Sequence, residues 1–280
     1  MKSTIQRAFI AGILLLLLFF TTPLGQVKSS QAQSDTEWSD PINLSNSGAS
    51  SDPSIVVDSD GVIHVIWVDA VDGYKYVQSE DGVKWSAPVT VNFPFKPGKD
   101  SRPTLIADSS GSIHIFWTRE IVKQDADGGQ IKDRNLMYAR TSSIFLSQPL
   151  SWASVEKLAD SVLDFYAVAD TRSSVHLTFV GDNAIGNAPA GIFYRRLDGK
   201  AWTPPGSLYT SQYFRTLALE ASHVRLAVTG GGASATVYAV WDDRSLKRIF
   251  LAKSSDGGKN WENGIQLRGP EDATGLSYPY

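Results

Sequence analysis

Apolar and polar residues alternate in four segments of the chain, each of which predicts a strand, a polar turn and a second strand that ends in an aromatic residue. The segments are PSIVVDSDGVIHVIW (53–67), PTLIADSSGSIHIFW (103–117), FYAVADTRSSVHLTF (165–179) and the looser LALEASHVRLAVTGGGASATVYAVW (217–241). A polar loop, a third strand, a turn and a fourth strand follow each segment. The third strands are YKYVQ, NLMYAR, GIFYRR and RIFLAK. The chain is therefore predicted to repeat a unit of four antiparallel strands.

All eight tryptophans fit this repeat. They end the second strand or open the fourth, and Phe179 takes the second-strand place in the third copy. The second-strand residues are Trp67, Trp117 and Trp241, and the fourth-strand residues are Trp38, Trp85, Trp152, Trp202 and Trp261. Packing between neighbouring repeats requires one ring per repeat at a fixed register, which favours a structural role for the tryptophans. The alternative is that the rings form an aromatic platform that binds sugars. The pattern predicts an all-β chain, a β-propeller of four-stranded antiparallel blades with about four blades plus partial strands, and essentially no helix after residue 32.

A tight turn joins the third and fourth strands. In SSDGGKNW (254–261) the carboxylate of Asp256 is expected to accept backbone N–H groups, and Gly257 and Gly258 permit positive φ. SEDGVKW (79–85) and RLDGKAW (196–202) repeat the pattern, the latter with Arg196 in place of the first serine. The residues expected to build these turns are Ser79, Asp81, Gly82, Trp85, Asp198, Gly199, Trp202, Ser254, Asp256, Gly258 and Trp261.

The pattern Ser-x-Asp-x-Gly-x-x-Trp resembles the Asp-box, or BNR repeat, of sialidase-like secreted β-propellers. The resemblance implies that the turn is structural and that the full ring has six blades. EWSDPINL (37–44) resembles the fourth-strand segment KWSAPVTV (84–91), and SYP (277–279) resembles the blade openings SDP and SRP. We therefore expect a propeller domain at 33–280 that is truncated at its C-terminal end.

The N-terminal residues predict an export signal. Lys2 and Arg7 precede an apolar run from Ala8 to Phe20, and the small residues around Ala32 suit signal-peptidase cleavage, so residues 1–32 are expected to be a signal peptide. The alternative is a retained N-terminal membrane anchor, although the run is shorter than the ~20 residues a spanning helix needs. We expect a secreted or periplasmic protein with no membrane span after cleavage.

Charge and cysteine content narrow the classes of partner. Removal of residues 1–32 takes away three basic residues and no acid, so the net charge changes from −3 to −6. An acidic chain without a Lys/Arg run does not suit nucleic acid. The sequence has no cysteine, so an exported chain must be stable without disulfides.

Neither a metal nor a cofactor is predicted. His64, His114 and His176 occupy one repeat position, which would place them in different blades as hydrogen-bonded structural side chains rather than as ligands of one metal. QDADGGQIKD (124–133) opens like a calcium loop. The twelfth position counted from Asp125 is Leu136, where a glutamate would be needed, so we expect a long solvated loop.

Loops after the second and fourth strands are expected to share the face that surrounds the channel mouth. Their charged residues are Asp69, Arg102, Arg119, Glu120, Asp182, Arg215, Asp242, Asp243 and Arg244. Most of these are expected to be solvated loop charges. The sialidase resemblance implies an aspartate acid/base, three arginines that bind the sialic carboxylate and a tyrosine nucleophile held by a glutamate. The weak candidates here are Asp69, Asp242 and Asp243 as acid, and Arg119, Arg215 and Arg244 as carboxylate contacts.

The sequence departs from the sialidase pattern before its first blade. The Arg-Ile-Pro motif of that family is absent, and Ser101-Arg102-Pro103 in the second repeat is the nearest approach. No catalytic set can be assembled. The sequence therefore favours a non-catalytic extracytoplasmic propeller that binds glycans or a cell-envelope protein. A sialidase-like glycoside hydrolase is the alternative, and another propeller enzyme or an assembly factor is the third possibility.

Overall fold

The computed structural model describes residues 39–95, 100–124, 127–143, 152, 154–216 and 222–269. The chain divides into two compact units, Met1–Asn43 and Leu44–Tyr280, and the described strands all lie in the second. The predicted signal peptide, Trp38 and the fragment at 277–279 fall outside the described residues. None of the helices in the described part of the chain combines the length and apolar character that crossing a membrane requires.

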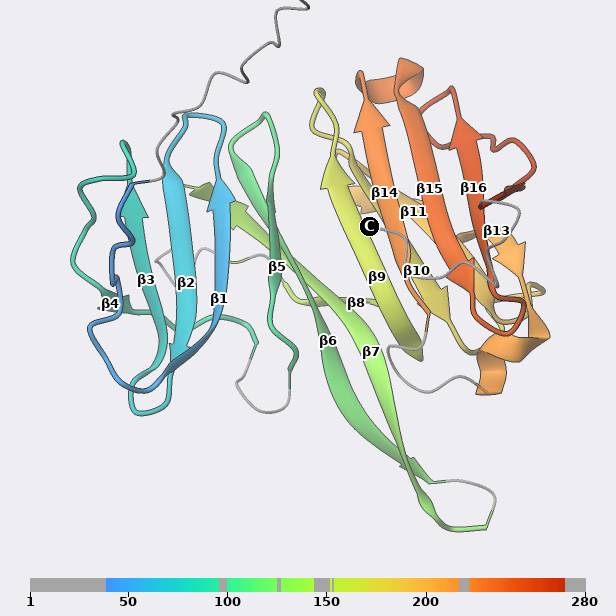
Figure 1. Cartoon of the computed structure of the whole chain (residues 1–280), viewed down its shortest axis with the longest axis horizontal. Helices are drawn as coiled ribbons and strands as arrows, with labels where there is room; N and C mark the ends of the chain where they lie inside the picture. Colours follow the sequence, from blue (N-terminus) through green and yellow to red (C-terminus); the bar gives the residue numbers. More distant parts are fainter. Residues whose placement is uncertain are drawn as a thin grey trace, which may run out of the picture. The chain divides into compact units, whose positions relative to one another are not determined.

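The described strands form four antiparallel sheets in which successive strands pair with one another (Figure 1). Sheet 1 contains β1 (Ser50–Val57), β2 (Ile63–Asp69), β3 (Gly73–Ser79) and β4 (Val89–Thr90). Sheet 2 contains β5 (Thr104–Ala107), β6 (Ser112–Gln124), β7 (Gln130–Ser142) and β8 (Glu156–Ala159). Sheet 3 contains β9 (Val162–Ala169), β10 (Val175–Gly181), β11 (Gly191–Asp198), β12 (Ala201–Trp202) and β13 (Gly206–Thr210), the last two both paired with β11. Sheet 4 contains β14 (Val224–Thr229), β15 (Thr236–Asp243), β16 (Arg248–Ser254) and β17 (Ile265–Leu267).

This up-and-down order is that of a propeller blade, so the predicted fold class, all-β with four-stranded antiparallel blades, is confirmed. The helical segments that the structure describes are short 3₁₀ turns, η3 (Gln212–Thr216) and η4 (Gly232–Ser234). The fourth repeat was the loosest in sequence because η4 and its glycines replace the Asp-containing turn of the other three sheets.

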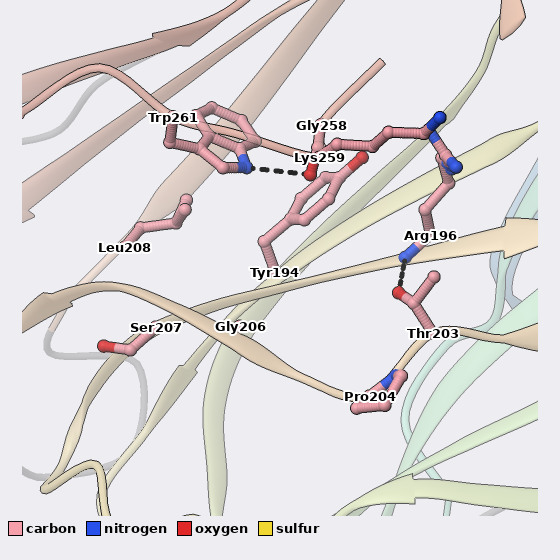
Figure 2. A pocket seen from close by; sticks show the side chains of 10 residues that line it. All are labelled: Tyr194, Arg196, Thr203, Pro204, Gly206, Ser207, Leu208, Gly258, Lys259 and Trp261. Carbon is pink, nitrogen blue, oxygen red and sulfur yellow. Dashed lines mark hydrogen bonds between the residues drawn. The ribbon is translucent and has the colours of Figure 1, made fainter. Parts of the chain in front are cut away.

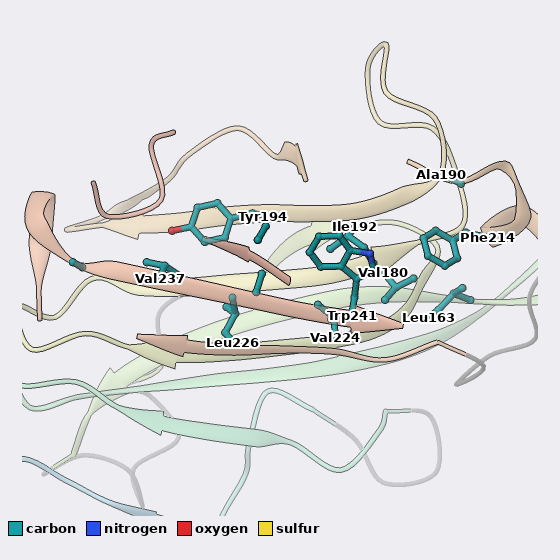
Figure 3. Close-up of a cluster of buried hydrophobic side chains, with 13 residues drawn as sticks. Leu163, Val180, Ala190, Ile192, Tyr194, Phe214, Val224, Leu226, Val237 and Trp241 are labelled. Atoms are coloured by element: carbon teal, nitrogen blue, oxygen red, sulfur yellow. The ribbon is translucent and has the colours of Figure 1, made fainter. Parts of the chain in front are cut away.

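Alternating side chains of sheets 2 and 3 pack against the sheets on either side. In β6, Ile115 and Trp117 belong to a cluster with sheet 1, whereas Phe116 belongs to a cluster with sheet 3. A third cluster joins sheets 3 and 4 around Trp241 and Tyr194 (Figure 3). The strand period of two therefore buries both faces of an inner sheet, and burial of apolar area holds consecutive sheets together.

The tryptophans of the second strands pack as predicted, since Trp67, Trp117 and Trp241 are all buried. The prediction that the other tryptophans open the fourth strand holds for Trp202 in β12 but is wrong for Trp85, Trp152 and Trp261. Trp85 and Trp261 lie several residues before β4 and β17. Their indole nitrogens bond back to the preceding turn, which holds the rings beside the turn.

The longest hairpin was not predicted. Pairing of β6 with β7 runs from Ser112↔Ser142 to Gln124↔Gln130, so half of the expected loop at 124–133 belongs to strands. Figure 1 shows this hairpin extending past the ends of β5 and β8. Leu136 is fully buried in β7, and the described residues contain no cluster of His, Cys, Asp or Glu that could hold a metal.

Candidate functional site

The turn after β16 is organised by two side chains. Ser254 Oγ accepts a hydrogen bond from Gly258 N at 2.9 Å, and Asp256 Oδ1 accepts one from Asn260 N at 2.9 Å. Hydrogen bonds from Asn260, first from its main chain and then from its side chain, lower the pKa of Asp256 to about 2. The predicted bonding of Asp256 to its own turn is confirmed.

The turn after β3 repeats this arrangement. Gly82 N donates to Ser79 Oγ at 2.8 Å, and Lys84 N donates to Asp81 Oδ1 at 2.7 Å. Trp85 Nε1 donates to Gly82 O at 3.1 Å, as Trp261 Nε1 does to Gly258 O at 3.2 Å. The two turns are therefore matched in their internal contacts.

The third copy departs from the predicted turn. Asp198 pairs with Ala201 across a tight hairpin at Gly199, and its carboxylate bonds to Nη2 of Arg196. Arginine at 196 lacks the hydroxyl oxygen that accepts backbone N–H groups in the other two turns. Trp202 therefore lies within β12 instead of following the turn.

The turn at 254–261 packs against sheet 3. Gly257 O accepts a hydrogen bond from Nη1 of Arg196, and Gly258, at φ +82°, lies beside Tyr194. Tyr194 and Trp261 contact edge to face, with ring centroids 4.9 Å apart. The turn is thus part of the junction between sheets 3 and 4, as well as a connection within its own sheet.

A cavity of about 270 Å³ lies at this junction (Figure 2). Strand β11 and the 203–208 segment form one side, and the turn of sheet 4 forms the other. Figure 2 shows the indole of Trp261 beside Tyr194, with Arg196 farther along the cavity. The lining residues are Tyr194, Arg196, Thr203, Pro204, Gly206, Ser207, Leu208, Gly258, Lys259 and Trp261.

Arg196 gives this cavity its hydrogen-bonding character. The residue is 7% exposed, and its Nη atoms bond to Gly257 O and Asp198 Oδ2. Its buried Nε has no hydrogen-bond partner in the part of the chain that the structure describes. A buried N–H without an acceptor is unfavourable by about 1–3 kcal/mol.

The sequence predicts a structural role for Trp261 and Gly258 and gives no indication of a cavity. The sequence does not predict that Leu208 and Lys259 line the same cavity, because their proximity to each other depends on how sheets 3 and 4 pack. One signal was present: Arg196 interrupts the serine position of the repeated turn. That exception marks the side chain that reaches from sheet 3 to the turn of sheet 4.

The repeated histidines are structural, as predicted. In sheet 3, His176 Nε2 lies 3.3 Å from Asp170 Oδ2, and Nδ1 lies 2.6 Å from the hydroxyl of Tyr194. A carboxylate can only accept, so Nε2 carries the proton and Nδ1 of the neutral ring accepts from the tyrosine. Burial lowers the pKa of His176, which favours this neutral form. The corresponding trios in sheets 1 and 2 are Asp58, His64, Tyr76 and Asp108, His114, Tyr138.

Two predicted site residues hold loops in sheets 1 and 2. Asp69 accepts hydrogen bonds from the Ser47 hydroxyl at 2.7 Å and from the main chain of its own turn, and these bonds lower its pKa. Arg119 forms a bidentate pair with the buried Asp100, at 2.8 and 2.9 Å. Both groups are thus committed to local structure.

The remaining candidates lie around sheet 4. Asp242 is fully buried and accepts from the Ser222 hydroxyl at 3.1 Å, and its Oδ2 lies 3.5 Å from Nε of Arg244. Asp243 accepts from the hydroxyl of Tyr209 at 2.9 Å. The side chains of Arg102 and Arg215 are exposed. Only Asp242, Asp243 and Arg244 of the six predicted site residues thus lie together, at the end of β15, and Asp243 also contacts sheet 3 through Tyr209.

A second polar cluster fastens the β6–β7 hairpin to sheet 3. The hydroxyl of the buried Ser161 donates to Asp133 Oδ2 at 2.7 Å and accepts from Lys123 Nζ at 3.1 Å and from Asn183 Nδ2 at 2.6 Å. Asp182 N donates to Ser161 O at 3.1 Å. Burial and then the charge of Asp133 raise the pKa of the Asp182 carboxyl to about 6.

Asp182→Asn is expected to raise stability at pH 7 and to leave it unchanged near pH 4. The folded pKa of Asp182 lies above its unfolded value of 3.8, so its favourable contribution is present in acid and is lost as pH rises through about 6. Melting temperatures of both proteins at several pH values test this. His176 acts in the opposite direction in both proteins, so their difference isolates Asp182. A difference that does not vary between pH 4 and pH 7 would contradict the assignment.

The sheets define the class of the chain: a protein built from β-propeller blades with a cavity between two of them. No protein-family model matches it, and no curated protein matches it in sequence. Membership of the sialidase-like family therefore stays a prediction.

Solved structures with a similar arrangement include a six-bladed propeller, the fucose-recognising lectin of Aleuria aurantia (13% identity, TM-score 0.48, 80% of this chain and 64% of the lectin). A protein of unknown function from Dyadobacter fermentans aligns with 13% identity and TM-score 0.48 over 78% of this chain and 69% of its own. A GH43 endo-arabinanase from Bacillus licheniformis aligns with 17% identity and TM-score 0.39 over 79% of this chain and 80% of its own. The chain thus spans less than two thirds of the lectin's length, and the fold assignment rests on its own four sheets.

Proposed function

We propose that this chain is a non-catalytic, saccharide-binding propeller module that acts outside the cytoplasm, and that the cavity between sheets 3 and 4 is its binding site. One observation carries the proposal. A buried arginine with an unused Nε–H lines a cavity that also presents the indole of Trp261.

The chemistry of the lining suits a sugar ring. A pyranose presents C–H groups on its faces and hydroxyl groups at its rim. Trp261 and Leu208 offer apolar surface to the C–H groups, and Thr203 and Ser207 supply hydroxyls. Arg196 Nε supplies a donor that a sugar hydroxyl oxygen would satisfy. The cavity volume lies just below the range for drug-sized ligands, which favours one or two sugar rings over a long chain.

The contacts of the acidic candidates favour binding over hydrolysis. Most glycoside hydrolases place two carboxyl groups on either side of the scissile bond, and the sialidase resemblance implies one aspartate acid/base opposite a tyrosine nucleophile. Asp69 holds a turn of sheet 1, whereas Asp242 and Asp243 hold the end of β15. The alternative of a sialidase-like hydrolase thus receives no uncommitted aspartate from these residues.

The proposed location follows from the N-terminal sequence. The apolar run at 8–20 after Lys2 and Arg7 is typical of an export signal, and a chain without cysteine suits folding in an oxidising compartment without mispaired disulfides. A glycan of the cell envelope, or a glycosylated envelope protein, is the partner that this location suggests.

Trp261→Ala is expected to weaken glycan binding by about 10–100-fold, because it removes the largest apolar wall of the cavity. The glycan is first identified with a glycan array, and its affinity is then measured by titration calorimetry. Trp85→Ala is the matched control, since Trp85 makes the same contact with its own turn but does not line the cavity. Equal affinity in the wild type and the Trp261 variant, or an array without any bound glycan, would refute the proposal.

A further inference from the structure

The trio of Asp170, His176 and Tyr194 in sheet 3 contacts sheet 4 at both of its ends. Asp170 Oδ2 accepts a hydrogen bond from Gly232 N of η4 at 2.7 Å. At the other end, the hydroxyl oxygen of Tyr194 lies 3.4 Å from Gly257 O, in the turn of sheet 4 that borders the cavity. His176 lies between these two contacts and is fully buried. A change at His176 therefore acts on the junction between the two sheets.

The Tyr194 hydroxyl has one proton and two acceptors within reach. Nδ1 of His176 lies 2.6 Å from the hydroxyl oxygen, whereas Gly257 O lies 3.4 Å from it. In the neutral imidazole the proton is on Nε2, toward Asp170, and Nδ1 accepts. The tyrosine proton then lies on the shorter contact, and Gly257 O accepts its hydrogen bond from Nη1 of Arg196.

A second proton on His176 reverses the direction of this hydrogen bond. Nδ1 becomes a donor to the Tyr194 oxygen, so the hydroxyl proton has to turn toward Gly257 O. A carbonyl oxygen has two lone pairs, and it can accept from the tyrosine and from Arg196 together. An ordinary O–H···O bond is about 2.7–2.8 Å long, so the turn would be drawn toward Tyr194. Gly258 and Trp261, which line the cavity on this turn, would move with it (Figure 2).

The corresponding trios of sheets 1 and 2 differ at the tyrosine. The hydroxyl of Tyr76 makes its second contact, at 2.7 Å, with Gln78 Oε1 of its own strand. The described hydrogen bond of the Tyr138 hydroxyl is the one to His114 Nδ1, at 2.9 Å. Among the hydrogen bonds of the described residues, the sheet 3 trio is thus the one in which the tyrosine also reaches a carbonyl of the neighbouring sheet.

The groups around His176 place its protonation in acid. Burial lowers the pKa of His176 below its ordinary value of 6.5, and the positive charge of Arg196 acts in the same direction. The carboxylates of Asp170 and Asp198 oppose this effect. From sheet 4, the carboxylate of Asp256 in the turn acts on the tyrosine of the trio. Protonated His176 therefore has Asp170 as its hydrogen-bonded counterion.

We propose that protonation of His176 turns the Tyr194 hydroxyl from His176 to Gly257 O, which narrows the cavity and weakens saccharide binding in acid. The effect on binding rests on the proposed function of the cavity. The exchange of hydrogen bonds depends only on the contacts of the trio, so the two parts of the proposal are measured separately.

The first measurement is a nuclear magnetic resonance titration of the full chain without ligand, from pH 8 to pH 5. Gly257 O and Gly258 N belong to one peptide group, so a new hydrogen bond at the carbonyl shifts the Gly258 amide resonance. We expect this resonance to titrate with the midpoint of the His176 ring nitrogens. Tyr194→Phe should abolish the coupled shift, and Tyr138→Phe, the same change in sheet 2, should retain it. A Gly258 resonance that does not follow His176 in the wild type would overturn the proposal.

The second measurement is the affinity for an array-identified glycan at pH 7.5 and at pH 5. We expect about three- to tenfold weaker binding at pH 5 in the wild type and in Tyr138→Phe, but a ratio near one in Tyr194→Phe. Asp182 also titrates in this range, but it is present in all three proteins. Equal or tighter binding of the wild type in acid would overturn the proposal. An array without bound glycan would contradict the proposed function, and the Gly258 resonance tests the hydrogen-bond exchange independently of that outcome.

Discussion

Gly258→Ala is expected to destabilise the chain by about 3 kcal/mol and to disrupt the cavity between sheets 3 and 4. Gly258 has a φ of +82°, and an added Cβ would lie 2.0 Å from the hydroxyl oxygen of Tyr194. Tyr194 is buried and hydrogen-bonded to His176, so it has little room to yield. Left-handed strain contributes about 1–2 kcal/mol and the steric conflict about 1–3 kcal/mol.

Gly61→Ala separates these two effects. Gly61 has a φ of +84°, but an added Cβ would meet no atom within 4 Å. Its loss of stability should be about 1 kcal/mol, from backbone strain alone. Chemical denaturation of both variants measures the difference, and an equal loss in the two proteins would show that sheet 4 does not pack on Tyr194 as described.

Asp170→Ala is expected to lower the free energy of unfolding by about 4 kcal/mol. Asp170 Oδ1 accepts from Arg172 N at 2.8 Å and Ser174 N at 2.9 Å. Its Oδ2 accepts from His176 Nε2 and, at 2.7 Å, from Gly232 N of η4 in the neighbouring sheet. Alanine would leave these donors without an acceptor in a buried site, and each such loss is unfavourable by about 1–3 kcal/mol, partly offset by relaxation and water.

Asp108→Ala is the matched control for the contact between sheets. Asp108 accepts from Ser110, from Ser112 N and from His114, all within its own sheet and turn. Its loss should be at least about 1 kcal/mol smaller than that of Asp170→Ala. Denaturant titration of both variants tests the ranking, and the reverse order would show that the bond to Gly232 contributes nothing.

The blade repeat was predictable because its main determinant is local. Alternation at a period of two assigns Ile115 and Trp117 to one face of β6 and Phe116 to the other before any partner sheet is known. The turns at 79–85 and 254–261 were predictable for the same reason, since Ser79, Asp81 and their counterparts bond to the main chain only a few residues away.

The geometry of the third turn and the length of the β6–β7 hairpin were not predictable from local pattern. Asp198 is followed by glycine like the other turn aspartates, but its carboxylate pairs with Arg196, which also reaches Gly257 in the next sheet. The hairpin of β6 and β7 continues beyond its sheet because two strands can satisfy each other's backbone groups without β5 or β8. The polar residues at 124–133 resemble a loop in composition, and only the pairing shows that they are not.

The amino-acid sequence by itself determined the all-β class, the four-strand unit, the buried tryptophan of the second strand and the structural role of the repeated histidines. These features depend on side-chain alternation and on contacts within one unit of about 50 residues. Tertiary structure alone decided that Trp261, Tyr194 and Arg196 surround one cavity, and that Asp242 and Arg119 hold loop ends. Those roles depend on which side chains of separate sheets meet, and packing between sheets fixes distances that no local sequence pattern encodes.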